Sequence, residues 1–424
     1  MSRFRFFLIL AIGLLAAVPV LGARDDYKLV QVAVFSRHNI RTPLTRPGSV
    51  TDSLLADGRS WHNWSAPAGE LSLKGGMAET AMGQYFGRWL EEEGLIPRNW
   101  QPSEREALFY ANSLQRTRAT ARYFASGMMP TARINVKYRP HIRNRVFLPL
   151  LTTCSDAFQA EARREQKLLE SGLQDSLARS FAVLERVLGL ESSPWFRVHG
   201  KHMVPEPVSI VYTKGEEPNI RSGSLRIGTH ASDALVLQYY EKQDLQEAAF
   251  GNDLTLGDWQ RIASVKDVFI DMLFGLPIVG LNAATGMLEE LVKELSAGGR
   301  KFTYLCGHDS SVNSIMTALG AYCTEDIKAI EKRAPLGGKL VFEKYLKEGT
   351  LYARLRLIYP GIEQLRAPEA LSPDNPPCVC PILLKGLQAN EDGFYSYSDL
   401  LGRMKEAIKA GKQAGSGILP DYLR

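Results

Sequence analysis

The first 140 residues alternate between short apolar strands and amphipathic helices, and this alternation constrains the fold more than any other feature of the chain. Residues 27–37 are apolar and rich in β-branched side chains, which predicts a buried strand. A helix is expected over 75–93, followed by a strand at 108–113, a second helix, and a strand at 132–140. Such alternation predicts an α/β fold with a mainly parallel sheet that is flanked by helices.

The pattern changes at about residue 153. From there to residue 266 helical periodicity dominates and strand signals are sparse, whereas strands and helices alternate again afterwards. In this last region, residues 337–346 and 350–361 are expected to form an antiparallel pair of strands. We therefore expect an α/β core made of residues 24–152 and 267–424, with a mostly helical insertion at 153–266 that caps it. The polar tail past about Ala414 is expected to be loosely ordered.

The N-terminal segment has the features of a secretory signal peptide. It carries Arg3 and Arg5, continues with an apolar stretch, and ends in small residues at Gly22 and Ala23. The apolar stretch has roughly 16 residues, which is short of the ~20 that a membrane span needs. We expect residues 1–23 to be a cleaved signal, with an uncleaved anchor as the alternative. The mature protein is then expected to be soluble and periplasmic.

The charge and the cysteine and histidine patterns bear on whether the protein binds nucleic acid or a metal ion. The formal net charge of +5 falls to +3 without the two arginines of residues 1–23, and no basic run is interleaved with aromatic residues, so nucleic acid is not an expected partner. The chain has five cysteines but no Cys-x-x-Cys pair, which disfavours a zinc ribbon. His199 and His202 could pair on a metal, although a solvated loop is the favoured interpretation. No metal or cofactor is expected.

Polar clusters follow three of the predicted strands, at residues 37–41, 112–116 and 307–309. The active sites of open α/β sheets lie at the carboxyl ends of strands, so we expect these clusters to converge on one pocket. The planar guanidinium of arginine matches phosphate oxygens and stays charged, which suits a dianionic phosphate. The side chains that define the predicted pocket are Arg37, His38, Arg41, Arg116, His308 and Asp309.

The position of His38 between two arginines has a chemical consequence. The neighbouring positive charges of Arg37 and Arg41 lower the pKa of the imidazole, so that it stays neutral in mildly acidic solution. A helix is predicted to begin directly after Asp309, and the N-terminus of a helix favours an anion. Both features fit a phosphate pocket.

These motifs resemble those of the histidine acid phosphatases, which form branch 2 of the histidine phosphatase superfamily. The segment RHNIRTP, from Arg37, is similar to the Arg-His-Gly-x-Arg-x-Pro signature of that family, and GHDSSV, from Gly307, is similar to its His-Asp motif. The segment ANSLQRTRATA resembles the segment that carries the third phosphate-binding arginine. The likeness spans nearly the whole mature chain. Within the family the periplasmic glucose-1-phosphatase branch is the most similar, because it shares Asn39 and the segment LQYYE at 237–241.

The resemblance implies a phosphoglycerate-mutase-like core and a set of roles. His38 would attack phosphorus and form a phosphohistidine. Asp309 would protonate the leaving oxygen and then serve as the base for water. No metal is required, because arginines supply the positive charge. The residues that the resemblance implies for substrate binding are Arg37, Arg41, Arg116 and His308.

The resemblance also assigns a glutamate to substrate selection. Glu241 would overhang the pocket, exclude bulky substrates such as phytate, and accept hydrogen bonds from sugar hydroxyls. The expected activity is hydrolysis of small phosphomonoesters such as glucose 1-phosphate. A phytase or broad-specificity acid phosphatase is the alternative, and a non-catalytic phosphate-ester-binding protein is a further one. The expected partner is a small phosphorylated sugar, without a membrane once the signal is removed; no oligomeric state is predicted.

Overall fold

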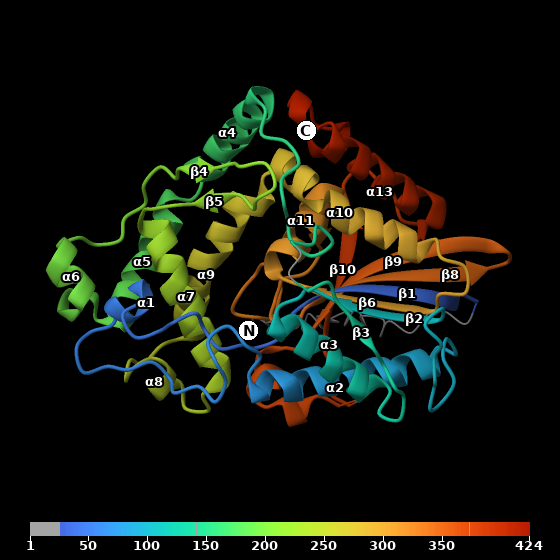
Figure 1. Cartoon of the computed structure of the whole chain (residues 1–424), viewed down its shortest axis with the longest axis horizontal. Coiled ribbons are helices and arrows are strands. Elements are labelled where there is room, and N and C mark those ends of the chain that lie inside the picture. Colours follow the sequence, from blue (N-terminus) through green and yellow to red (C-terminus); the bar gives the residue numbers. More distant parts are fainter. Residues whose placement is uncertain (1–25, 141–142, 373) are drawn as a thin grey trace, which may run out of the picture.

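A central sheet organises the protein, and helices cover both of its faces (Figure 1). The computed structural model describes residues 26–140, 143–372 and 374–424, so the expected signal peptide lies outside the described residues. The strands of the sheet run in the order β3-β2-β6-β1-β8-β9-β10-β7, and β11 pairs with β9. Their bounds are β1 (Lys28–Arg37), β2 (Ala107–Ala111), β3 (Val136–Lys137), β6 (Phe302–Gly307), β7 (Ala321–Cys323), β8 (Lys339–Lys347), β9 (Thr350–Tyr359), β10 (Cys378–Leu384) and β11 (Tyr395–Ser396).

The sheet is mixed, whereas a mainly parallel sheet was expected. Strands β3, β2, β6 and β1 are parallel, but every pairing from β1/β8 to β10/β7 is antiparallel. The β8/β9 pairing was predicted and has a local cause: Glu348 and Gly349 have φ values of 48° and 78°, which gives the tight two-residue turn that joins these strands. The other antiparallel pairings are made by strands that no tight turn joins. The predicted α/β fold with flanking helices is confirmed, and the parallel half is the part that carries the predicted polar clusters.

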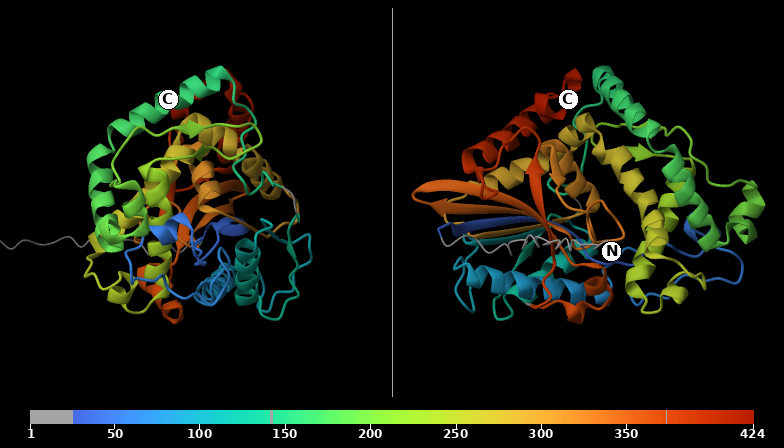
Figure 2. Two further views of the ribbon diagram at one scale, coloured as in Figure 1. Left: turned by 60° about the vertical axis from the view of Figure 1, so that its left-hand side comes forward. Right: turned by 180° about the vertical axis from the view of Figure 1, so that it is seen from behind.

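Two sets of helices sandwich the sheet (Figures 1 and 2). One face is covered by α2 (Leu73–Glu92) and α3 (Gln115–Met128). The other face is covered by α10 (Pro277–Leu295), α11 (Asp309–Leu319) and α13 (Tyr397–Lys412). Helix α2 begins at Leu73 because the side chain of Ser72 accepts a hydrogen bond from the backbone of Gly75 and so caps the helix.

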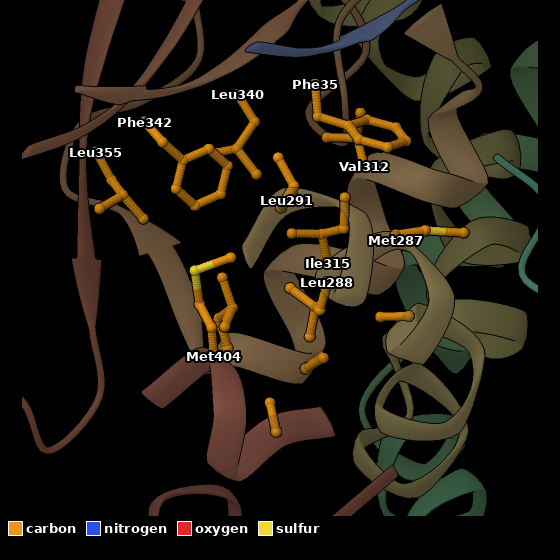
Figure 3. Close-up of a cluster of buried hydrophobic side chains, with 14 of the residues drawn as sticks. Phe35, Met287, Leu288, Leu291, Val312, Ile315, Leu340, Phe342, Leu355 and Met404 are labelled. Carbon is orange, nitrogen blue, oxygen red and sulfur yellow. The ribbon is translucent and has the colours of Figure 1, made fainter. Parts of the chain in front are cut away.

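The main hydrophobic core lies between the sheet and the second helical face. In Figure 3, side chains from β1, β8 and β9 point toward side chains from α10, α11 and α13, and all of them are nearly inaccessible to solvent. This burial fixes α11, and with it the turn that precedes α11, against the carboxyl end of β6. The labelled residues are Phe35, Met287, Leu288, Leu291, Val312, Ile315, Leu340, Phe342, Leu355 and Met404.

A second group of helices lies beside the sheet, and most of its apolar side chains form a separate hydrophobic core (Figure 1). Phe158 and Ala162, which belong to the first helix of this group, pack in the main core instead. Across the described residues no single helix is long and apolar enough to cross a membrane. The segments Leu256–Gly275 and Pro277–Leu295 have that length and composition only as a pair, and they are bent by 78° where they meet. The elements of this group are α4 (Asp156–Ser171), α5 (Gln174–Leu188), η1 (Leu190–Ser192), α6 (Pro194–His199), β4 (Ile210–Val211), β5 (Asn219–Ile220), α7 (Ser224–Glu241), α8 (Leu245–Ala248), α9 (Leu256–Ile270) and the π-turn η2 (Asp271–Gly275).

The C-terminal tail is packed, so the expectation of a loosely ordered tail was wrong. Leu419 is buried, and the hydroxyl of Tyr422 donates to the carbonyl of Ala318 at the end of α11 (2.8 Å). The segment is polar on average, so the few side chains that make these contacts gave no sequence pattern that predicts packing. The short elements that complete the chain are α1 (Val50–Ser53), α12 (Ile362–Arg366), η3 (Pro368–Ala370), η4 (Ala414–Ser416) and η5 (Asp421–Leu423).

Candidate active site

The three polar clusters lie together because their strands are neighbours in the parallel half of the sheet. In the register of the sheet, Arg37 pairs with Gly307 and Ala111 pairs with Cys306. Strands β1, β6 and β2 therefore end at the same edge, and the residues that follow them meet there. The structure brings together six of the seven predicted site residues, which are Arg37, His38, Arg41, Arg116, His308 and Asp309.

His38 is buried and has one ring nitrogen available for chemistry. Its backbone N–H donates to the carbonyl of Gly307 (3.1 Å), and its Nδ1 lies 2.9 Å from the carbonyl of Asn39. Because a carbonyl only accepts, Nδ1 carries the proton and Nε2 has the free lone pair. Burial lowers the pKa of His38 well below its usual value, and the charges of Arg116 and the other nearby cations lower it further. The ring is therefore neutral.

The three arginines are held by contacts that leave some of their N–H groups unused. Arg37 donates from Nη1 to the carbonyl of Ala334 (2.6 Å), and Arg41 Nη2 lies 2.7 Å from Asp233 Oδ2. Arg116 donates from Nη1 to the carbonyl of Gly69 (3.2 Å), and its buried Nε has no hydrogen-bond partner among the described residues. Burial, with the repulsion of Arg41, lowers the pKa of Arg116 to about 10, so it stays charged in acidic and neutral solution.

His308 caps α11 and Asp309 is the first residue of that helix. Burial, with the charge of Arg116, lowers the pKa of His308 to about 3, so this ring is neutral as well. Asp309 Oδ2 lies 3.0 Å from Lys266 Nζ and 3.3 Å from Arg37 Nη2. Burial alone would raise the pKa of Asp309, but Lys266 and Arg37 outweigh it and hold the pKa well below its usual range. Asp309 is a carboxylate in the ligand-free protein.

Five of these six groups line a cleft of about 540 Å³ between the sheet edge and the second helical group, and the sixth, Arg37, contacts the cleft residue Asp309. Helices α7 and α9 contribute charged residues to its wall, namely Asp233 and Lys266, which the sequence analysis missed. Both carried a weak signal. Asp233 precedes Glu241 by about two helical turns, and Lys266, with Asp267 beside it, interrupts a largely apolar stretch of α9.

Glu241 does not line the cleft, and the expectation that it overhangs the pocket is not met. Its Oε2 accepts a hydrogen bond from the hydroxyl of Ser72 (2.9 Å), and its backbone carbonyl accepts from Lys74 Nζ (2.7 Å). Glu241 therefore joins the end of α7 to the start of α2. Asp233 is the α7 carboxylate that faces the cleft.

Asn39, where the family carries glycine, also points away from the cleft. Its Nδ2 donates to Glu79 Oε2 (2.8 Å), and Lys339 Nζ lies 2.8 Å from Glu79 Oε1 in the same buried network. Its Oδ1 accepts from the backbone N–H of Ile40 (2.8 Å). The side chain thus braces the loop that carries His38.

Possible metal ligands do not gather in the described part of the chain, where no group of three or more His, Cys, Asp or Glu side chains could hold an ion. His202 Nδ1 lies 2.8 Å from Glu185 Oε2, and the ring of His199 packs against Trp195 at 4.7 Å. These two histidines therefore have separate structural contacts.

Comparisons with known proteins show which family this chain is similar to. Residues 28–150 match the family described as the histidine phosphatase superfamily (branch 2). The chain is 33% identical over 413 residues to a glucose-1-phosphatase of Salmonella typhimurium, which covers 94% of this chain and 97% of the relative. It is 31% identical to a glucose-1-phosphatase of Providencia rettgeri, over 92% of this chain and 95% of that protein.

The fold is similar to that of solved phytases. The structure of Hafnia alvei phytase in complex with myo-inositol hexakis sulphate superposes with a TM-score of 0.81 at 20% identity, and the match covers 92% of this chain and 99% of the phytase. At this level of identity the likeness supports the mixed α/β fold.

Proposed function

This chain belongs to branch 2 of the histidine phosphatase superfamily, and we propose that it is a phosphoric monoester hydrolase that acts on small substrates such as glucose 1-phosphate. One observation carries the proposal. The neutral His38, with its Nε2 lone pair free, lines one cleft with Arg41, Arg116 and the carboxyl group of Asp309, which Arg37 contacts.

The site can perform the reaction in two steps. Nε2 of His38 forms a bond to phosphorus while the bond from phosphorus to the leaving oxygen breaks, and Asp309 gives its proton to that oxygen. A water molecule then attacks the phosphohistidine, loses a proton to Asp309, and releases inorganic phosphate and free His38. Arg37, Arg41 and Arg116 bind the non-bridging oxygens throughout, which is the main requirement of phosphoryl transfer.

Asp309 must gain a proton before it can donate one. In the ligand-free site Arg37 and Lys266 keep it ionised. A bound phosphate monoester brings negative charge that competes for Arg37 and repels the carboxylate, so the pKa of Asp309 rises in the complex. Substrate binding thus prepares the acid, and mildly acidic solution favours the proton-bearing form.

The charge of the outer cleft supports a small, uncharged leaving group. Among the described residues, Arg143 and Arg226 line the cleft together with Glu216 and Glu217, so two basic side chains are matched by two acidic ones; burial raises the pKa of Glu217 and so weakens its negative charge in acidic solution. Arg143 Nη1 also lies 3.9 Å from Glu216 Oε1. A substrate with six phosphates needs a strongly positive cleft, whereas carboxylates can accept hydrogen bonds from sugar hydroxyls. This favours glucose 1-phosphate over phytate.

We extend the proposal to the organisation and location of the protein. Residues 153–266 act as a cap over a core made of 24–152 and 267–424, which is supported by the contribution of α7 and α9 to the cleft wall. The features of residues 1–23 support export to the periplasm.

The experiment compares the wild type with His38→Ala on glucose 1-phosphate and phytate at pH 4 to 7. We expect the wild type to hydrolyse glucose 1-phosphate faster, and His38→Ala to lose about 10³-fold or more in kcat with the fold intact, because no other nucleophile lies at this position. Acid-labile phosphate trapped on His38 would identify the intermediate. His199→Ala, on the exposed end of α6, is the matched control and should retain full activity.

Two results would overturn the proposal. Near-wild-type turnover by His38→Ala would exclude the nucleophile. Faster hydrolysis of phytate than of glucose 1-phosphate would assign the protein to the phytase alternative.

A further inference from the structure

Five side chains of alternating charge form a continuous chain along the wall of the cleft. Arg41 Nη2 lies 2.7 Å from Asp233 Oδ2, and the other oxygen of Asp233 lies 2.5 Å from Lys266 Nζ. Lys266 Nζ is also 3.0 Å from Asp309 Oδ2, and that same oxygen is 3.3 Å from Arg37 Nη2. The chain begins and ends at an arginine of the predicted phosphate site.

Lys266 is the central link. It belongs to α9, in the proposed cap, whereas Asp309 begins α11 in the core. The side chains of Lys266, Asp233 and Asp309 are 16%, 14% and 18% exposed, so water screens these contacts only weakly. A lysine between two carboxylates can form an ion pair with either of them. The pair with one carboxylate becomes stronger when the other carboxylate is protonated.

We propose that Lys266 is a positioning residue for the proton donor: it holds the carboxyl group of Asp309 at the cleft and, because Asp233 competes for its charge, it governs when Asp309 takes up a proton. The inference rests on the proposed phosphatase function. When a phosphate ester occupies the arginines, Asp233 loses part of its pairing with Arg41 and draws Lys266 toward itself. Asp309 is then left with less positive charge, takes up a proton, and gives it to the leaving oxygen.

Several other groups face Asp309 and form the background to this effect. None of them is itself replaced in the Lys266 and Asp233 variants, so each variant is compared with the wild type against the same set of neighbouring groups. The groups are Arg37 at the end of β1, His38 and Arg41 after that strand, Arg116 in α3, Glu217 before β5, Glu331 at 3.8 Å from Arg37, and the adjacent His308.

The two substitutions are expected to act in opposite directions. Activity falls as pH rises through the pKa of Asp309 in the enzyme–substrate complex, because the donor must carry a proton. Lys266→Met removes a cation, so Asp309 keeps its proton to higher pH. The alkaline limb of the plot of kcat against pH therefore moves to higher pH by about one unit. Asp233→Asn leaves Asp309 as the sole carboxylate on Lys266, so the limb moves to lower pH.

The experiment measures kcat and KM against pH for the wild type, Lys266→Met, Lys266→Arg and Asp233→Asn. Glucose 1-phosphate is compared with 4-nitrophenyl phosphate, whose leaving group needs little protonation. We expect Lys266→Met to lose about tenfold more kcat on glucose 1-phosphate than on 4-nitrophenyl phosphate. Lys266→Arg should restore the position of the limb. Lys293→Met, on the exposed side of α10, is the matched control and should behave as the wild type.

A merely structural role of Lys266 predicts a different outcome. Equal losses on both substrates with an unmoved limb, or shifts of Lys266→Met and Asp233→Asn in the same direction, would overturn the inference. If thermal unfolding shows that Lys266→Met does not fold, the Asp233→Asn variant tests the inference alone. A shift of its alkaline limb to lower pH supports the inference, and an unmoved limb or a shift to higher pH overturns it. A wild type that is inactive on both esters would overturn the proposed function, and this inference with it.

Discussion

At the residue scale, His308 has a buried ring nitrogen without a partner. Its Nε2 makes no hydrogen bond within the described residues, and its ring centroid lies 5.6 Å from that of His38. Leaving a buried polar atom unpaired costs about 1–3 kcal/mol. The pKa of about 3 keeps the ring neutral, so in the tautomer with the proton on Nε2 it offers one N–H to the cleft. A phosphate oxygen would satisfy that donor.

We therefore expect His308→Ala to lower kcat/KM on a phosphomonoester by about 10²-fold, which is typical for removal of one donor to a developing anion. His308→Gln should retain more activity, because its amide N–H can occupy the position of Nε2. Steady-state kinetics and the inhibition constant of inorganic phosphate measure both effects. Equal losses in the two variants would show that the donor has no part in binding.

At the scale of elements, α2 and α3 cross with their backbones in contact. A Cβ added at Gly83 would lie 2.1 Å from the carbonyl oxygen of Phe124, and one added at Gly127 would lie 2.1 Å from that of Thr80. Glycine is needed at these positions because any side chain would push the helices apart. A Cβ at Gly75 would likewise lie 2.2 Å from the carbonyl oxygen of Ile40. The close approach of α2 thus supports the loop that carries His38.

Gly83→Ala should lower the free energy of unfolding by about 1–3 kcal/mol or more, because two backbones must separate to admit the methyl group. Gly402→Ala is the matched control, since a Cβ at that position in α13 meets nothing within 4 Å. There alanine should raise stability by roughly 0.5–1 kcal/mol through its helix preference. Denaturant unfolding compares the two variants. A Gly83→Ala protein as stable as the wild type would contradict the backbone contact.

At the scale of the whole molecule, two buried carboxyl groups join the second helical group to the rest of the chain. Glu165 of α4 accepts from the backbone N–H of Ile278 at the start of α10 (3.1 Å). Asp267 of α9 accepts from the backbone N–H of Lys332 (2.7 Å). Burial raises the pKa of Glu165 to about 8 and that of Asp267 to about 7. Each group keeps a proton in the folded protein that it loses above about pH 4.5 when unfolded.

Stability should therefore fall as pH rises from about 4.5, where these groups ionise in the unfolded chain, to their folded-state pKa values of about 7 and 8. A carboxyl group with a raised folded-state pKa stabilises the fold at low pH, and this contribution is lost as pH rises toward that pKa, by at most about 1.4 kcal/mol per pH unit for each group. Thermal unfolding at pH 6.5 and pH 8 measures the decline. Glu165→Gln and Asp267→Asn should each reduce it, and a protein more stable at pH 8 than at pH 6.5 would contradict the expected direction.

Much of the fold and most of the site could be predicted from local patterns. The ends of the strands at Arg37, Ala111 and Gly307 follow from apolar runs that give way to polar clusters, and parallel strands necessarily end at one edge. The antiparallel pairing of β8 with β9 was predicted, but the other antiparallel pairings of the sheet and the packed tail were not. Their pairing depends on long-range contacts that leave little periodic signal.

By itself, the sequence determined that His38, His308 and Asp309 would meet beside three arginines, because strand ends and the direction of parallel strands follow from short-range patterns. Only the tertiary structure decided which helical carboxylate faces the cleft, Asp233 rather than Glu241, and that Lys266 contacts Asp309. The physical reason is that the rotation of α7 and α9 about their axes is set by packing against the rest of the molecule. Asp233 and Glu241 lie eight residues apart, about 12 Å along α7, so the position of the helix along its axis also decides which of them reaches the site, and a rotation of one residue, about 100°, would turn either one away.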